Sequence, residues 1–161
     1  MKRPSPYKAF FKRSLSNVDG VFTIQDLDGN AIFKRLPARS GQAGFTKGSW
    51  TRGKSPIPFG THYIRIAKPN QEGQWAGDNG IGEFWPIYNV ESNTRLIKQA
   101  DGKGERWDVG LHPENKHKGS AGCIVLINET QAQKKELVRL SKFLKSLIAQ
   151  GYDSLVLEVF E

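Results

Sequence analysis

The sequence predicts a mainly β, that is β-rich α+β, protein with one C-terminal α-helix. Three observations support this fold class. The chain of 161 residues holds 17 glycines and 8 prolines, which is typical of short strands joined by many turns. Most apolar residues lie in short β-like runs. One segment near the C-terminus has helical periodicity, and a last β-like run follows it.

The N-terminal part divides into an arm, a hairpin and a loop. Residues 1–17 are basic and lack periodicity, so we expect a loose arm followed by a single domain over residues 18–161. Two β-rich runs surround the glycine turn at residues 28–30, which predicts a hairpin over residues 21–33. Residues 37–55 are rich in glycine and serine, which predicts a loop.

The rest of the chain predicts further strands and the helix. Alternation over residues 61–67 places His62 on the apolar face of a strand, so we interpret it as a core or rim histidine. A helix is expected from a cap at Asn128 or Thr130 to about residue 150. Its apolar stripe consists of Leu137, Leu140, Leu144, Leu147 and Ile148. The other β-like runs are residues 83–91, 94–99, 105–113, 124–127 and 154–160.

The charge and the termini limit the classes of function. The formal net charge is +8, which suits an anionic partner or a solvated basic surface. The basic residues are scattered and form no dense block with interleaved aromatics, so no nucleic-acid partner is expected. No apolar run is long enough for a standard signal peptide or a transmembrane segment. A single cysteine excludes an internal disulfide.

That cysteine, Cys123, lies in the stretch GLHPENKHKGSAGCIVLI together with His112 and His117. Alternation over residues 105–113 places Leu111 toward the core and His112 on the polar face, at the end of a strand. Small residues precede the cysteine and an apolar run follows it. From the residues alone, Cys123 is a buried structural thiol, a metal ligand or a nucleophile activated by a histidine.

The run GSAGCI resembles the signature of the L,D-transpeptidase catalytic domain, also called the YkuD-like fold. That signature is an upstream His, then Ser/Thr-His-Gly-Cys, an apolar residue, and Asn or Arg. The residues that match it are His112, Ser120, Gly122, Cys123 and Ile124. The run SPIPFGTHYIRI is similar to an earlier strand of the family. Its Ile-Pro-x-Gly form is similar to the branch that includes antibacterial effectors delivered by type VI secretion.

The sequence departs from this signature in two residues and in one spacing. Ala121 stands where the family usually has His, and Val125 stands where it has Asn or Arg. The spacing from His112 to Cys123 is also shorter than usual. His117 is the residue available to replace the missing histidine, as a substrate-binding group.

The resemblance implies a β-sandwich with the helix packed on it, and acyl transfer on peptidoglycan stem peptides. Cys123 would form a thioester, His112 would be the base, and Ser120 and Gly122 would complete the catalytic motif. The acceptor would decide between L,D-transpeptidase, D-amino-acid exchange and L,D-carboxypeptidase activity. No metal and no cofactor is implied.

The resemblance also implies a location and partners. The substrate lies in the periplasm or cell wall, and the sequence has no standard export signal, so we expect delivery by a secretion system or a phage. A secretion system and a cognate immunity protein are the protein partners that this route implies.

Two other functions remain open at this point. A zinc hydrolase could use His112, His117 and Cys123 as ligands, although the sequence contains no Cys-x-x-Cys or His-Glu-x-x-His pattern. A non-enzymatic β domain that binds cell wall or nucleic acid would instead have a buried thiol.

Overall fold

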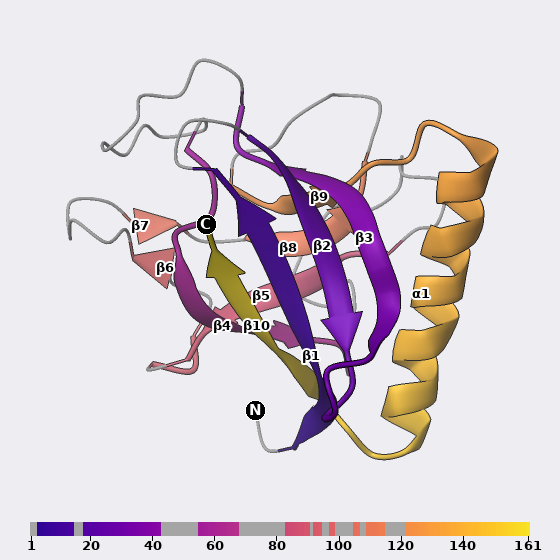
Figure 1. Ribbon diagram of the computed structural model, residues 1–161. Coiled ribbons are helices and arrows are strands. Elements are labelled where there is room, and N and C mark those ends of the chain that lie inside the picture. Colours follow the sequence, from indigo (N-terminus) through magenta and orange to yellow (C-terminus); the bar gives the residue numbers. More distant parts are fainter. Residues whose placement is uncertain are drawn as a thin grey trace.

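The computed structural model describes residues 3–14, 18–42, 55–67, 83–90, 92–94, 97–98, 105–106, 109–114 and 122–161. These residues form ten strands and one helix (Figure 1). The strands are β1 (Pro4–Arg13), β2 (Asp19–Gln25), β3 (Ala31–Ser40), β4 (Gly60–Arg65), β5 (Trp85–Asn89), β6 (Ile97–Lys98), β7 (Glu105–Arg106), β8 (Gly110–Pro113), β9 (Ile124–Leu126) and β10 (Ser154–Phe160). The helix α1 (Gln131–Ala149) lies between β9 and β10 in the chain.

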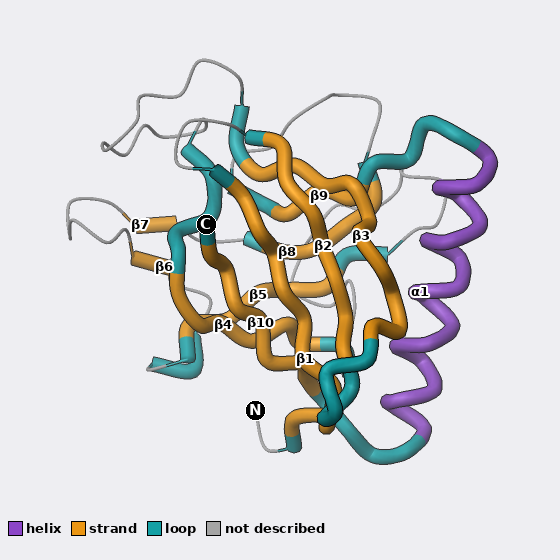
Figure 2. The backbone as a smooth tube through the Cα atoms, viewed as in Figure 1, coloured by secondary structure: helices purple, strands orange, loops and turns teal. Residues whose placement is uncertain are grey.

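Eight of the described strands form a closed barrel in the order β1, β10, β4, β5, β8, β9, β3, β2 (Figure 2). The pairs β1–β10 and β8–β9 are parallel, and the other neighbours in the barrel are antiparallel. Closure gives each barrel strand two neighbours, which removes the open edges that a sheet otherwise exposes. Strands β6 and β7 form a separate two-stranded sheet.

The strand directions place the ends of β1 and β3 and the beginning of β9 at the same end of the barrel. Arg13 ends β1, Ser40 ends β3, and Ile124 begins β9. We call this end of the barrel the Ser40 rim. Gly122 and Cys123, directly before Ile124, therefore lie at the Ser40 rim.

The core fills the barrel because alternate side chains of each strand point inward. Phe11, Phe22 and Phe33 come from three neighbouring strands and are fully buried, as are Ile64 on β4 and Leu157 on β10. Full burial of one such side chain stabilises the fold by about 1.5–3 kcal/mol. The packed core side chains thus stabilise the barrel together with the hydrogen bonds between its strands.

The helix α1 lies beside β3 and runs along the side of the barrel in Figure 1. Its Phe143 ring meets Tyr7 edge-on at 5.0 Å and meets Phe33 at 5.4 Å, measured between ring centroids. The apolar stripe of α1 joins the core through Leu137, Leu140, Leu144 and Leu147. Within the described part of the chain, no helix is long and apolar enough to cross a membrane.

Several local expectations are confirmed. The described chain is mainly β with one C-terminal helix, and the hairpin forms from β2 and β3 around Gly29, which has a φ of 84°. The helix begins after Thr130, so Thr130 rather than Asn128 is the cap. His62 is buried on β4, as its place on the apolar face indicates.

Two local expectations are wrong. Residues 1–17 were expected to form a loose arm, but Pro4–Arg13 is strand β1, which pairs with both β2 and β10. Its inward positions include the fully buried Ala9 and Phe11, and exposed lysines alternate with them, which hides the two-residue period in a basic segment. The expected loop over residues 37–55 begins too early, because β3 continues to Ser40.

The expected two-sheet sandwich also differs from the structure. The strands form one closed barrel, because β1 pairs with β10 at one junction and β8 pairs with β9 at another. Both junctions are parallel pairs between strands that do not form a hairpin. Alternation within a strand is the same in a sandwich and in a barrel, so it does not distinguish the two.

The capping box of α1 provides a test of this local structure. The Thr130 side chain accepts a hydrogen bond from the Gln133 backbone at 3.1 Å, and the Gln133 side chain accepts one from the Thr130 backbone at 2.9 Å. We expect Thr130→Ala to lower the free energy of unfolding by about 1 kcal/mol in urea titrations. Thr130→Ser keeps the hydroxyl and should remain close to wild type. Equal losses in the two variants would contradict a capping role.

Candidate active site

Cys123 immediately precedes β9 and is partly exposed. The preceding Gly122 has a φ of 118°, a left-handed conformation that a residue with a Cβ rarely adopts. The carbonyl of Gly122 accepts a hydrogen bond from the Ser40 hydroxyl at 3.2 Å. The backbone that leads into Cys123 is therefore held at the Ser40 rim.

The register of β8 and β9 relates the positions of His112 and Cys123. These parallel strands pair Leu111 with Ile124 and His112 with Val125, two residues after Cys123. Leu111 and Ile124 are fully buried in the core, so alternation places His112 on the opposite face, and its continuation by one residue beyond β9 predicts the same face for Cys123. From the strand rise and spacing, the Cα atoms of His112 and Cys123 are roughly 8 Å apart, a gap that the two side chains can span.

A hydrogen bond sets the tautomer of His112. Its Nδ1 lies 2.8 Å from the carbonyl oxygen of Pro113. A carbonyl oxygen only accepts, so Nδ1 carries the proton, and the neutral ring has its lone pair on Nε2. Burial lowers the pKa of His112 below its usual value, and the hydrogen bond to Pro113 opposes part of that change. The ring is accordingly neutral at pH 7, with Nε2 as a proton acceptor.

Phe84, just before β5, covers His112. The two rings stack with their centroids 5.5 Å apart and an angle of 21° between their planes. The Phe84 ring also occupies the space beside Gly110, where an added Cβ would come within 2.2 Å of a ring carbon. Gly110 thus makes room for the ring that shields His112 from water. Sequence reasoning missed Phe84, and the glycine within an alternating strand was the signal for a close approach.

The segment before β4 is tied to the same rim. The backbone N–H of Ile57 donates to the Ser40 hydroxyl at 2.8 Å. The Ile57 carbonyl accepts two hydrogen bonds from Arg13, at 3.2 and 2.9 Å. The Arg13 guanidinium also lies 4.1 Å from the centroid of the Phe59 ring. Burial lowers the pKa of Arg13 to about 10, so it stays charged at neutral pH.

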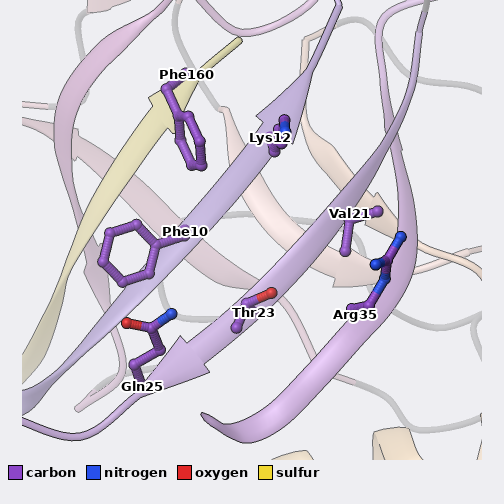
Figure 3. Close-up of a pocket in the computed structure, with 7 residues that line it drawn as sticks. All are labelled: Phe10, Lys12, Val21, Thr23, Gln25, Arg35 and Phe160. Carbon is purple, nitrogen blue, oxygen red and sulfur yellow. The ribbon is translucent and has the colours of Figure 1, made fainter. Parts of the chain in front are cut away.

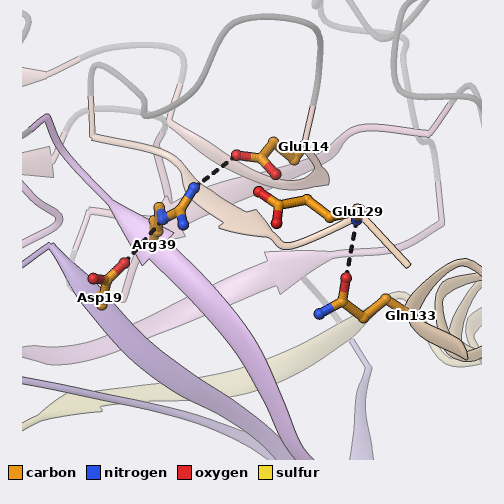
Figure 4. Close-up of polar contacts among 5 residues, drawn as sticks. All are labelled: Asp19, Arg39, Glu114, Glu129 and Gln133. Carbon is orange, nitrogen blue, oxygen red and sulfur yellow. Dashed lines mark hydrogen bonds and ion pairs between the residues drawn. The ribbon is translucent and has the colours of Figure 1, made fainter.

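A charged network lies beside the paired strands (Figure 4). Arg39 on β3 is opposite Val125 in the ladder with β9. Its Nε is 2.9 Å from Asp19 Oδ1, and its Nη1 is 2.9 Å from Glu114 Oε1. The Asp19 side chain is 62% exposed, whereas the Glu114 side chain is only 5% exposed. Val125 stands where the motif usually has a polar residue, and Arg39 lies opposite it on the neighbouring strand.

His62 takes no part in this arrangement. It lies on β4, which β5 and β8 separate from β9. Its Nε2 donates to the Pro58 carbonyl at 3.1 Å, and its buried Nδ1 has no hydrogen-bond partner among the described residues. Burial lowers the pKa of His62, and the hydrogen bond to Pro58 opposes part of that change.

Several expected site residues cannot be placed. His117, Ser120 and Ala121 lie outside the described residues. The replacement of the motif histidine by His117 and the zinc ligand set both depend on them. Within the described part of the chain, no group of three or more His, Cys, Asp or Glu side chains could hold a metal ion.

A separate groove of about 360 Å³ lies on the outer face of the barrel (Figure 3). Its lining residues are Phe10, Lys12, Val21, Thr23, Gln25, Arg35 and Phe160. The rings of Phe10 and Phe160 meet edge-to-face, with their centroids 6.3 Å apart. None of the described motif residues His112, Gly122 and Cys123 lines this groove, so it is distinct from the candidate active site.

Comparison with known proteins adds no relative, because no protein family, curated protein or solved structure matches the chain. Among the sequence-predicted residues, His112 lies on β8 opposite Val125, and Gly122 and Cys123 lie directly before β9, the strand that pairs with β8. Sequence reasoning missed Arg39 and Glu114. Their contact joins residues 75 positions apart, and no local pattern marks such a pair.

The two buried histidines predict how stability depends on pH. The folded pKa values of His62 and His112 are both lowered, so the unfolded chain binds protons first as the pH falls below about 6.5. Their contribution to stability is therefore present above that pH and is lost as the pH falls through the folded pKa values. We expect the free energy of unfolding, measured by urea titration, to be lower at pH 5.5 than at pH 7.5.

The variants His62→Gln and His112→Gln should each make this pH dependence weaker. A wild-type slope in both variants would show that the histidines do not cause it.

Proposed function

We propose that this chain is a cysteine-dependent acyltransferase that acts on peptidoglycan stem peptides. L,D-transpeptidase, D-amino-acid exchange and L,D-carboxypeptidase activities share this chemistry and differ only in the acceptor. The observation that supports the proposal is the pairing of β8 with β9, which puts His112 opposite Val125, two residues after Cys123. The resemblance of the Cys123 motif to the L,D-transpeptidase signature supplies the class of substrate.

The state of His112 supports a role as the base. A general base must be unprotonated at the working pH and must hold its lone pair toward the nucleophile. Because Nδ1 donates its proton to the Pro113 carbonyl, Nε2 is the unprotonated nitrogen, and burial keeps the ring neutral. Phe84 limits the access of water on one side of the ring.

The reaction would proceed in two steps. His112 Nε2 takes the proton of the Cys123 thiol, and the thiolate attacks the carbonyl carbon at the L-centre of the diamino acid. A C–S bond forms, the C–N bond to the terminal D-alanine breaks, and His112 returns its proton to the leaving amine. In the second step an amine or a water molecule attacks the thioester and releases the thiol.

The backbone around the nucleophile would stabilise the tetrahedral intermediate. The N–H groups of Gly122 and Cys123 are the proposed donors to its oxyanion, a contribution that is worth several kcal/mol in acyl transfer. Gly122, in its left-handed conformation, itself adds no side chain next to the thiol. The bond from Ser40 to the Gly122 carbonyl would keep this turn rigid during the reaction.

Two further observations bear on the alternative functions. Cys123 is partly exposed, whereas an inert structural thiol is usually fully buried. The net charge of +8 suits an anionic cell-wall polymer, and an electrostatic attraction of this kind does not depend on one residue.

The decisive experiment is incubation with defined tetrapeptide muropeptides, followed by mass spectrometry of both the protein and the peptides. We expect a thioester adduct on Cys123 that has lost the terminal D-alanine, together with cross-linked, exchanged or trimmed products. Cys123→Ala should give neither adduct nor products while it keeps the wild-type melting temperature. Products from a correctly folded Cys123→Ala variant would contradict the proposal, as would a wild-type protein that gives no adduct and no products.

A substrate-free measurement tests the Cys–His pair. A thiol beside a base is more reactive at neutral pH than an ordinary cysteine, whose pKa is about 8.5. The rate of Cys123 alkylation by iodoacetamide should fall roughly tenfold or more at pH 7 in His112→Gln. The difference should narrow at pH 9.5, where the thiol ionises unaided. His62→Gln is the matched control and should react like wild type. Equal rates for wild type and His112→Gln would remove His112 from this role.

A further inference from the structure

We propose that Arg39 and Glu114 are a positioning pair that holds His112 in its Nδ1–H tautomer. They act through the Pro113–Glu114 peptide group and touch no reacting atom. The inference rests on the proposed role of His112 as the base. Its central test reads the protonated nitrogen of the ring directly, so it is independent of any activity on peptidoglycan.

The Pro113–Glu114 peptide group is bonded at both of its ends. Its N–H, which belongs to Glu114, donates to the Leu126 carbonyl at 2.8 Å. Its carbonyl, which belongs to Pro113, accepts from His112 Nδ1 at 2.8 Å. The orientation of this one planar group therefore decides which nitrogen of His112 carries the proton.

The side chain of Glu114 is the next anchor. It is 5% exposed, and its Oε1 lies 2.9 Å from Arg39 Nη1. A buried carboxylate is costly unless it is paired and hydrogen-bonded. Arg39 thus provides the charge that allows Glu114 to stay beneath the surface, and Glu114 in turn fixes the end of β8.

The position of Arg39 is itself set by the barrel. Arg39 is opposite Val125 on β9, and Val125 is opposite His112 on β8, so three adjacent strands align the pair with the ring. Asp19 holds the Nε of Arg39 at 2.9 Å, which leaves Nη1 to reach Glu114 (Figure 4). Hydrogen bonding to Asp19 is the main cause that raises the pKa of Arg39.

Loss of Arg39 should release the peptide group. The unpaired Glu114 carboxylate would turn toward solvent and pull on the end of β8, which would weaken the Glu114 N–H bond to Leu126 and let the Pro113 carbonyl rotate away from Nδ1. The Asp19 contact is different, because its side chain is 62% exposed, and exposed ion pairs contribute little. The inference therefore predicts a strong effect at Arg39 and a weak one at Asp19.

The experiment uses the full chain labelled with ¹⁵N-histidine and two-bond ¹H–¹⁵N correlation spectra at pH 7.5. The wild-type His112 signals should be those of an Nδ1–H ring, with Nε2 unprotonated. In Arg39→Met the Nε2–H form should become the major form. Cys123 alkylation at pH 7 should slow roughly tenfold, because a mispositioned base loses much of its effect. A wild-type spectrum in a folded Arg39→Met variant would overturn the proposal, and so would an Nε2–H ring in the wild-type protein.

Three controls separate positioning from general stability. Glu114→Gln retains an oxygen that can accept from Arg39 and should keep the wild-type tautomer. Asp19→Asn should also keep it. Arg139→Met removes the Arg139–Glu136 ion pair on α1, whose N–O distance is also 2.9 Å, and should leave His112 unchanged. A tautomer change in Arg139→Met as large as that in Arg39→Met would overturn the proposal.

A second variant covers the case in which Arg39→Met fails to fold. The double variant Arg39→Met/Glu114→Leu leaves no unpaired buried carboxylate, because the Asp19 side chain is 62% exposed, and replacement of both buried partners is usually tolerated. It should fold and still lose the Nδ1–H preference, whereas retention of that preference would overturn the proposal. Absence of muropeptide products together with the expected tautomer change would count against the proposed function alone.

Discussion

The parallel pairing of β8 with β9 is the constraint on which the candidate site depends. Its register buries Leu111 and Ile124 completely and thereby turns His112 to the opposite face, with Cys123 directly before the buried Ile124. A slip of one residue on one strand would move that strand's side chains to the other face. Because each buried aliphatic side chain contributes about 1.5–3 kcal/mol, such a slip is strongly disfavoured. The hydrophobic core therefore fixes the positions of the backbone segments that carry the proposed base and the proposed nucleophile.

Closure of the barrel links strand β1 to the candidate site by hydrogen bonds. β1 completes the barrel between β2 and β10, and its last residue, Arg13, binds the Ile57 carbonyl. Ile57 in turn donates to Ser40, and Ser40 donates to the carbonyl of Gly122. A line of hydrogen bonds thus runs from the N-terminal strand to the residue before Cys123. Arg13, at the start of this line, stays charged at neutral pH, since its pKa is about 10.

The sequence was sufficient for features that depend on neighbouring residues. Alternation placed Leu111 toward the core and His112 on the other face, and the capping pattern located the start of α1 at one of two residues. The motif singled out Cys123 and His112 together. Barrel closure could not be foreseen, because it depends on the pairing of β1 with β10 at the two ends of the chain. Arg39 and Phe84 were missed for the same reason, since each acts on the site from a strand or segment that is distant in sequence.

The two described histidines show why burial alone does not make a base. Both are buried, both have a lowered pKa, and both donate to a proline carbonyl. His62 donates from Nε2, so its lone pair is on Nδ1, close to its own backbone and within the barrel. His112 donates from Nδ1, so its lone pair is on Nε2, the nitrogen farther from its own backbone.

What distinguishes His112 is therefore the direction of one carbonyl group. Val125, 1% exposed, lies between Arg39 and His112 in the three-strand row, so no direct contact between the guanidinium and the ring is expected there. In the proposed arrangement, Arg39 acts on the ring through Glu114 and the backbone of Pro113. An apolar residue at the motif's polar position is consistent with such an arrangement, in which the neighbouring strand provides the charge and the backbone conveys its effect to the base.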